Sequence, residues 1–346
     1  MSETLRPVIG QAIAIFIALA LGTVVIMVVG ESPILVFATL LEGAFGSTER
    51  IAGTLLQTTP ILVCGIAACI SFRGGLFNIG VEGQLFMGGF AAVIVGIYLP
   101  LPAGLHMLVG ILVAMLAGMA WIAIPAFFRA RYNANEVVST ILSNYVAVLL
   151  TSYFTIFLFK RPGGWSETAP ILPSAYLPEL FSFSRLNWGL IIGLALAVAV
   201  QLYFRHTSRG YSVSIMGQNL KFAEYGGVDI KRHIFLVLLA SGAVGGLAGG
   251  IEALGVHHRF MEGFAPGFGF DGVIAALLAN GNPIGTIGAA LFFGALRSGS
   301  LLLEVDTNAS REIITVIQAL IILSVSAQIL MRRRGDSTAA ERRWKF

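Results

Sequence analysis

Residues 105–128 read LHMLVGILVAMLAGMAWIAIPAFF, a stretch without a single charged side chain. A helix needs about 20 largely apolar residues to cross the hydrocarbon core of a bilayer. Val8–Gly30 and Val137–Phe159 are also long enough and free of charge. Because hydrocarbon offers no hydrogen-bond partners, such stretches must satisfy their backbone groups internally, and we predict that they are transmembrane helices.

The composition of the whole chain favours the same interpretation. Of its 346 residues, 56% are hydrophobic and only 12% are charged, whereas roughly 25% are charged in an ordinary soluble domain. Lipid is therefore the expected solvent for much of the exterior.

Val8–Gly30 is too long for the core of a signal peptide and is predicted to be a retained span. Cys64 and Cys69 fall within one predicted span, which favours buried free thiols.

We predict an all-α polytopic membrane protein with about ten segments, at residues 8–30, 52–72, 80–98, 104–128, 137–159, 188–204, 234–255, 268–282, 284–303 and 312–331. Segment 268–282 is short, so it either tilts across the bilayer or re-enters it. Lys and Arg concentrate in cytoplasmic loops. Placing the N-terminus inside puts fifteen of them on the cytoplasmic side against six outside, so both termini are predicted to be cytoplasmic.

The loops have distinct compositions. Residues 1–331 form the predicted transmembrane domain, and 332–346 form a basic cytoplasmic tail. We expect this tail to contact anionic headgroups rather than nucleic acid. The loop at 205–233 is polar and cytoplasmic, while 160–187 holds four of the 12 prolines and is predicted to be an irregular outer cap. Ser32–Phe45 is expected to form a short amphipathic helix on the membrane surface.

A weak similarity between two short segments of the chain indicates an inverted repeat. Phe77-Asn78-Ile79-Gly80 opens the third segment, and Phe270-Asp271-Gly272 opens the eighth. Segments that lie five apart in order cross the bilayer in opposite directions. Transporters are often built from such inverted repeats, with the substrate handled near the interface between them.

Polar residues in or near the spans are the candidate functional residues. Ionisable groups inside a membrane are costly and usually face a water-filled cavity or a partner. We expect these residues to border a solute pathway: Phe77, Asn78, Glu82, Asn135, Glu136, Asn144, Glu252, Phe270, Asp271 and Arg297. Structural roles remain open for each, because Asp271 can cap the helix that it begins and Arg297 can pair with Glu252.

The sequence carries no motif for chemistry. No Gly-Lys-Ser or Gly-Lys-Thr of a P-loop occurs, so ATP binding by that route is not expected. His257-His258 lacks the spacing of a zinc site, and no Gly-x-Ser-x-Gly elbow is present. We therefore expect a protein that is not an enzyme and needs neither metal nor cofactor.

Several motifs together resemble one family. GLFNIGVEGQ at 75–84 closely resembles the signature of ABC-importer permeases of the branched-chain amino acid/ribose class, especially its nucleoside and simple-sugar branch. In order along the chain, further similar segments are NEVVSTI at 135–141, SGAVGGLAGGIEALG at 241–255, GFGFDG at 267–272, NPIG at 282–285 and FGALR at 293–297. The resemblance covers about residues 32–330.

The resemblance implies ten transmembrane helices and a multi-pass location in the bacterial inner membrane. It also implies three partners, namely a second permease subunit, cytoplasmic ABC ATPase subunits and an external solute-binding protein. The expected cargo is a nucleoside or a related sugar-containing solute, with simple sugars such as ribose as the alternative. An ion-driven secondary transporter and a membrane enzyme or scaffold are the alternatives from other classes.

The segment GQNLKFAEYGG at 217–227 is similar to the family's coupling segment, which docks into the ATPase. Gly217, Asn219, Ala223 and Gly227 match the pattern Gly-x-Asn-Pro-x-x-Ala-x-x-x-Gly, while Leu220 replaces its proline. This departure leaves open how the short helix begins. We expect Ala223→Glu to leave the protein inserted but to uncouple transport from ATP hydrolysis.

Overall fold

A computed structural model describes residues 20–306 except 25, 29 and 31, together with 316 and 319. In this part of the chain every regular element is helical, and only isolated β-bridges join loop residues. The chain divides into two compact units, one formed by 51–294 and the other by 1–50 with 295–346. The predicted segment 312–331, most of segment 8–30 and the tail at 332–346 lie outside the described residues, apart from residues 316 and 319.

Seven described helices are long and apolar enough to cross a membrane. They are α3 (Thr48–Arg73), α4 (Val81–Tyr98), α5 (Leu105–Tyr132), α6 with its π-helical continuation η1 (Glu136–Leu158), α7 (Gly189–His206), α10 with η3 (Ile230–His257) and α12 (Pro283–Asp306, of which Pro283–Leu303 meets the length and apolarity test). An eighth candidate is the pair Ala20–Val28 and α2 (Pro33–Phe45), bent by 115°. Seven of the predicted segments therefore coincide with apolar helices, and the count of ten stays a prediction.

The predicted segment 268–282 contains a helix, α11 (Phe268–Leu278), of only 11 residues. At a rise of about 1.5 Å per residue such a helix covers about half of the hydrocarbon core. The expectation that this segment is too short to span comfortably agrees with its length.

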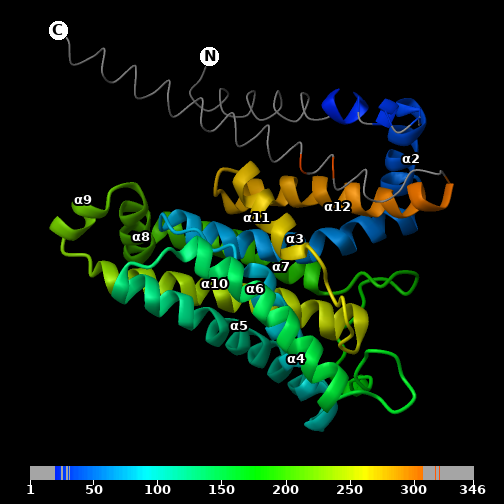
Figure 1. Cartoon of the computed structure of the whole chain (residues 1–346), viewed down its shortest axis with the longest axis horizontal. Coiled ribbons are helices and arrows are strands. Elements are labelled where there is room, and N and C mark those ends of the chain that lie inside the picture. Colours follow the sequence, from blue (N-terminus) through cyan, green and yellow to red (C-terminus); the bar gives the residue numbers. More distant parts are fainter. Residues whose placement is uncertain are drawn as a thin grey trace. The chain divides into compact units, whose positions relative to one another are not determined.

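Glycines determine how the larger unit packs (Figure 1). Helix α10 contacts both α4 and α5, which also contact each other. A Cβ added at Gly249 would collide with the Leu85 carbonyl of α4, and one added at Gly246 would collide with the Ala114 carbonyl of α5. Small residues let membrane helices approach this closely. Most of the apolar length of α3, α4 and α10 is buried, whereas most of α5, α6 and α7 is not.

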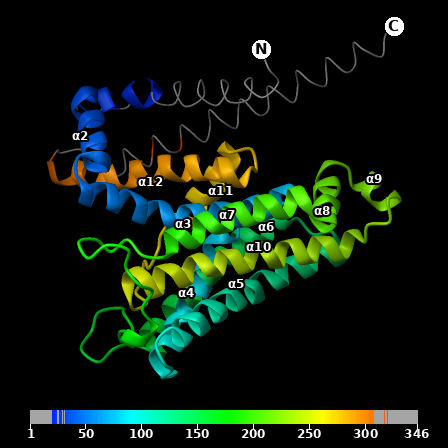
Figure 2. The same cartoon turned by 180° about the vertical axis from the view of Figure 1, so that it is seen from behind.

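The two long loops of this unit lie at opposite ends of its helices (Figure 2). At one end, α8 (Ser208–Gln218) and α9 (Leu220–Tyr225) follow α7. At the other, the loop at 160–187 is irregular apart from the short 3₁₀ helix η2 (Pro173–Ala175). Arg259 holds this loop through two 3.0 Å hydrogen bonds to the Glu167 carboxylate. The loop at 160–187 is thus irregular, as predicted, and its outer location stays a prediction.

Candidate functional site

A buried pair of amides lies at the start of α4. The Asn78 Nδ2 donates to Gln84 Oε1 at 3.2 Å, and Gln84 Nε2 donates back to Asn78 Oδ1 at 3.1 Å. Asn78 Nδ2 also donates to the Ser241 hydroxyl of α10 at 2.8 Å, and Ser241 in turn donates to the Ala67 carbonyl of α3 at 2.6 Å. These hydrogen bonds tie three membrane helices together, and Asn78 itself has no exposed surface.

Asn144 of α6 completes the same helix start. Its Oδ1 accepts the Gly83 backbone N–H at 2.8 Å, and its Nδ2 donates to the Ile79 carbonyl at 2.8 Å. The first turn of a helix has N–H groups without partners inside the helix. The buried Asn144 side chain satisfies one of them from a neighbouring span, which positions α6 against the motif at 75–84.

Glu82 joins α4 to the short helix α11. Its two carboxylate oxygens accept the backbone N–H groups of Gly267 and Gly269, each at 2.6 Å. Charge-assisted hydrogen bonds of this kind are short and strong, and a negative charge at a helix N-terminus is favoured by the helix dipole. Gly269 leaves room for this approach, because an added Cβ would collide with the Glu82 backbone. Asp271, also buried, lies in the first turn of the same helix.

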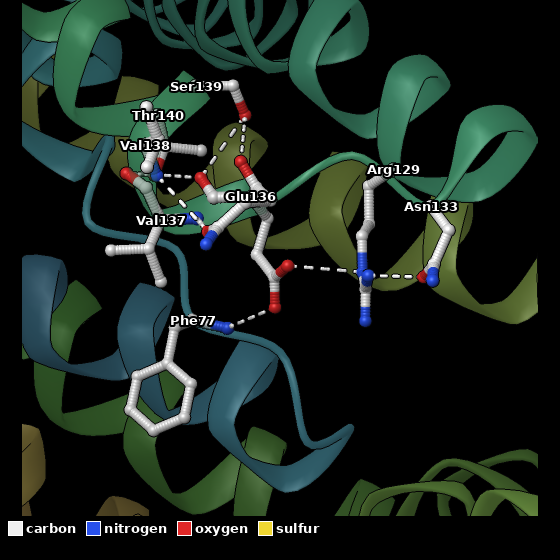
Figure 3. A network of polar contacts seen from close by, with 9 residues as sticks. Phe77, Arg129, Asn133, Glu136, Val137, Val138, Ser139 and Thr140 are labelled. Carbon is white, nitrogen blue, oxygen red and sulfur yellow. Dashed lines mark hydrogen bonds and ion pairs between the residues drawn. The ribbon is translucent and has the colours of Figure 1, made fainter.

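Glu136 connects α5, α6 and the Phe77 turn (Figure 3). Its Oε2 lies 3.1 Å from Arg129 Nε at the end of α5, and its Oε1 accepts the Phe77 backbone N–H at 3.4 Å. Asn135 caps α6 by accepting the Val137 N–H at 2.9 Å. Figure 3 shows that the Phe77 ring points away from this network.

The remaining predicted pathway residues lie elsewhere. Glu252 is buried at the end of α10, 3.6 Å from His257 Nε2. Arg297 belongs to the other unit, where it is half-buried on α12 and its carbonyl accepts the Ser300 hydroxyl at 2.7 Å. The side chains of Phe77 and Phe270 are 43% and 40% exposed. Of the ten predicted pathway residues, these two rings and Asn135 are exposed, Arg297 is half-buried and the other six are buried.

The predicted coupling segment contains a capped helix. Asn219 is the N-cap of α9, and its Oδ1 accepts the Phe222 N–H at 3.1 Å. Asn is among the best N-cap residues, so the helix begins at Leu220 without the family's proline. Gly227 follows the helix with a φ of +81°, a conformation that suits glycine.

Gly217 lies directly against the turn that leads out of α3. A Cβ added at Gly217 would collide with the Arg73 carbonyl, and one added at Gly75 would lie 2.9 Å from the Gly217 Cα. The coupling segment and the motif at 75–84 are therefore in backbone contact. The motif spacing did not reveal this contact, although both positions are glycines.

The exposed side chains of α9 were missed by sequence reasoning, which followed the matching small residues. Ala223 is only 1% exposed and packs inside its own chain, whereas Phe222 is 62% and Tyr225 92% exposed, with Leu220 also exposed. Contiguous exposed apolar side chains are typical of contact surfaces, so α9 is a candidate docking helix. In the sequence these apolar residues alternate with the charged residues Lys221 and Glu224, and this pattern is the one that indicates an exposed helix.

Cys64 and Cys69 are buried free thiols, as predicted. Within the described residues, no three His, Cys, Asp or Glu side chains gather as metal ligands do.

Comparisons with known proteins agree on one kind of protein. Residues 50–326 match the family described as branched-chain amino acid transport system / permease component. The chain is 34% identical to the guanosine ABC transporter permease protein NupP of Bacillus subtilis, over 96% of this chain and 97% of that protein. It is 31% identical to the glucose ABC transporter permease protein TsgB13 of Haloferax volcanii, over 96% and 90%. Identity to a second Bacillus subtilis protein, the guanosine ABC transporter permease protein NupQ, is 27% over 73% and 82%. No solved structure was found to match.

Proposed function

This chain belongs to the family of branched-chain amino acid transport system permease components, and we propose that it carries nucleosides or related sugar-containing solutes across the bacterial inner membrane. It is a permease subunit of an ABC importer, a multi-pass membrane protein and not an enzyme. The guanosine permease similar over nearly its whole length supports a nucleoside. The glucose permease keeps a simple sugar such as ribose as the alternative.

The proposed assembly contains two permeases, two cytoplasmic ATPases and an external solute-binding protein. Bacillus subtilis has two guanosine permeases similar to this chain, which supports a second, homologous permease subunit. The chain itself has no P-loop, so ATP is hydrolysed in a partner. We further propose ten transmembrane helices with an inverted repeat, a domain over 1–331, a basic tail at 332–346, and both termini in the cytoplasm.

The contact between Gly217 and the Arg73–Gly75 turn is the observation that carries the proposed mechanism. In this mechanism α9 docks on the ATPase through Leu220, Phe222 and Tyr225. When the ATPases close, the displaced segment pushes the turn at Gly75, because two backbones in contact cannot move independently. The turn leads directly to Phe77, whose N–H is held by Glu136.

Two exposed aromatic rings border the proposed solute route, and buried polar side chains hold the neighbouring helix starts in place. Phe77 and Phe270 offer aromatic faces for a nucleobase. Glu82 fixes the start of α11, which carries Phe270, and Asn144 fixes the start of α4. The remaining candidates of the same unit border or support the route: Asn78, Asn135, Glu136, Glu252 and Asp271. Arg297, in the other unit, stays a predicted pathway residue. Opening and closing of the route then follows from relative movement of α4, α6 and α11.

The test uses the full transporter in proteoliposomes with its ATPase, second permease and binding protein. We expect ATP-dependent uptake of labelled guanosine that excess adenosine reduces more than excess ribose does. Phe222→Ser with Tyr225→Ser is expected to abolish both uptake and copurification of the ATPase, because the docking surface loses its apolar side chains.

The matched control is Phe181→Ser with Phe183→Ser, which removes two rings, 50% and 54% exposed, from the opposite loop. This variant should still copurify with the ATPase. Copurification of the ATPase with the α9 variant at the normal ratio would remove the docking assignment. Stronger competition by ribose than by adenosine would replace the nucleoside with a simple sugar.

A further inference from the structure

A pocket of about 780 Å³ opens between α7, α8 and α10. It lies at the end of the unit that carries α8 and α9, and none of the proposed solute-pathway residues lines it. Its lining changes character along its length. Val200, Leu236 and Ala240 form an apolar wall from the membrane helices, whereas Arg209, Ser212 and Arg232 form a polar wall near the loop.

The polar wall holds positive charge with unused hydrogen-bonding capacity. Neither the Arg209 nor the Arg232 guanidinium forms an ion pair with a carboxylate in the described part of the chain. Asp229, the acidic residue in the lining, accepts the Arg232 backbone N–H at 3.1 Å as the N-cap of α10. The two arginines and Asp229 leave the lining with a net positive charge.

Other groups near the polar wall also favour the binding of an anion. His233 lines the pocket, and its Nδ1 lies 2.9 Å from the Asp229 carbonyl, so this nitrogen carries a proton and Nε2 remains available. Tyr203 and Ser208 supply hydroxyl groups to the lining. The Cζ atom of Arg73 lies 5.8 Å from the centre of the ring of Phe204, another lining residue.

We propose that this pocket binds the phosphate of an anionic phospholipid, with its acyl chains along the wall of Val200, Leu236 and Ala240. Arginine presents a planar fork of donors that matches phosphate oxygens. Basic pockets between transmembrane helices on the cytoplasmic side suit anionic headgroups. A pocket with an apolar wall beside a cationic wall fits a lipid, because acyl chains can contact the apolar wall. A soluble anion would contact only the cationic wall. The proposal rests on the docking of α9 on a cytoplasmic ATPase proposed above, which places the neighbouring α8 on the cytoplasmic side.

The test counts lipid that stays bound to the full-length chain. The protein is purified in detergent, supplied with equal amounts of phosphatidylglycerol and phosphatidylcholine, and weighed by native mass spectrometry. We expect one phosphatidylglycerol retained per chain and no phosphatidylcholine. Arg209→Gln with Arg232→Gln should weaken retention roughly thirtyfold, because each basic residue near an anionic lipid contributes a factor of about five.

The matched control is Arg205→Gln with Lys231→Gln. These exposed residues neighbour the pocket in the chain but do not line it, and the variant removes the same two charges. It should retain the lipid as the unmodified protein does. Equal loss from both variants would show a diffuse surface effect and overturn the proposal.

A second arm distinguishes a lipid from a soluble phosphate. Millimolar inorganic phosphate is added before the lipid, and it should leave phosphatidylglycerol retention unchanged. Displacement of the lipid by inorganic phosphate would assign the pocket to a soluble anion and overturn the lipid proposal. Because retention is measured without ATPase or solute, a failure here is distinct from a failure of the transport proposal.

Discussion

At the scale of single residues, the carboxylate of Glu82 has a defined task. It accepts two backbone N–H groups at the start of α11, both at 2.6 Å. In Glu82→Gln one oxygen becomes an NH₂ group, so a donor faces a donor. We expect the free energy of unfolding to fall by about 1.5–3 kcal/mol, the usual contribution of a hydrogen bond to a charged group. Thermal unfolding of the purified chain in detergent measures this loss.

Glu42→Gln is the matched control for Glu82→Gln. Glu42 is an exposed acid that pairs with Arg50 at 3.0 Å. Exposed ion pairs contribute about 0–1 kcal/mol, so this change should shift the unfolding temperature little. An equal shift for the two variants would mean that Glu82 does not hold α11 in the folded protein.

At the scale of helices, length and apolarity predicted the seven segments that coincide with apolar helices of spanning length. Residues 105–128 contain no charge, and α5 covers them in full although Pro125 lies inside the helix. The π-helical ends of α6 and α10 were not predictable from the sequence. At η3 the chain continues to His258 with a φ of +54°, and the loop at 160–187 hydrogen-bonds to it through the Ile171 N–H. Such ends depend on contacts with distant segments, which periodicity does not contain.

The buried position of Ala223 on α9 changes the interpretation of the Ala223→Glu variant. A helix of six residues has one inward face, and Ala223 occupies it at 1% exposure. A glutamate there would have to be buried within the chain itself, at a high cost in desolvation. Loss of transport in that variant would therefore follow from a disturbed loop, and the exposed Phe222 and Tyr225 are the sharper test of docking.

Helix packing gives a prediction for Gly249 of α10. An added Cβ would overlap the Leu85 carbonyl of α4, which is backbone and cannot rotate away. We expect Gly249→Ala to force α10 away from α4 and to destabilise the fold by about 1–3 kcal/mol or more. The measurement is the yield of monodisperse protein after size-exclusion chromatography, together with its unfolding temperature.

Gly288→Ala serves as the control for Gly249→Ala. Gly288 lies within α12, where an added Cβ meets nothing within 4 Å. Alanine has the higher helix propensity, so this variant should be as stable as the unmodified chain or slightly more so. Equal yields of both variants would contradict the close packing of α10 on α4.

At the scale of the whole molecule, several residues predicted to border a solute pathway are found to join helices, and their pathway role stays a prediction. Asn78, Glu82, Asn144 and Glu136 were selected as costly polar groups in a membrane, and each holds a junction between helices. Their partners are mainly backbone groups of glycines and of turn residues. A single sequence does not identify such partners, because every residue except proline can supply a backbone N–H.

The proposed orientation of the molecule leads to a labelling experiment. Cys64 and Cys69 have no exposed surface, so the unmodified chain should not react with a membrane-impermeant maleimide. Tyr225 and Trp165 are 92% and 91% exposed, at opposite ends of the larger unit. In right-side-out cells or spheroplasts we expect Trp165→Cys to be labelled and Tyr225→Cys to be protected. In inverted vesicles the pattern should reverse, because the excess of Lys and Arg favours the cytoplasm for the α9 end. Labelling of Tyr225→Cys from outside would place α9 on the external side, where no cytoplasmic ATPase could contact it. The proposed transmission of movement from the ATPase through Gly217 to the Phe77 turn would then be ruled out.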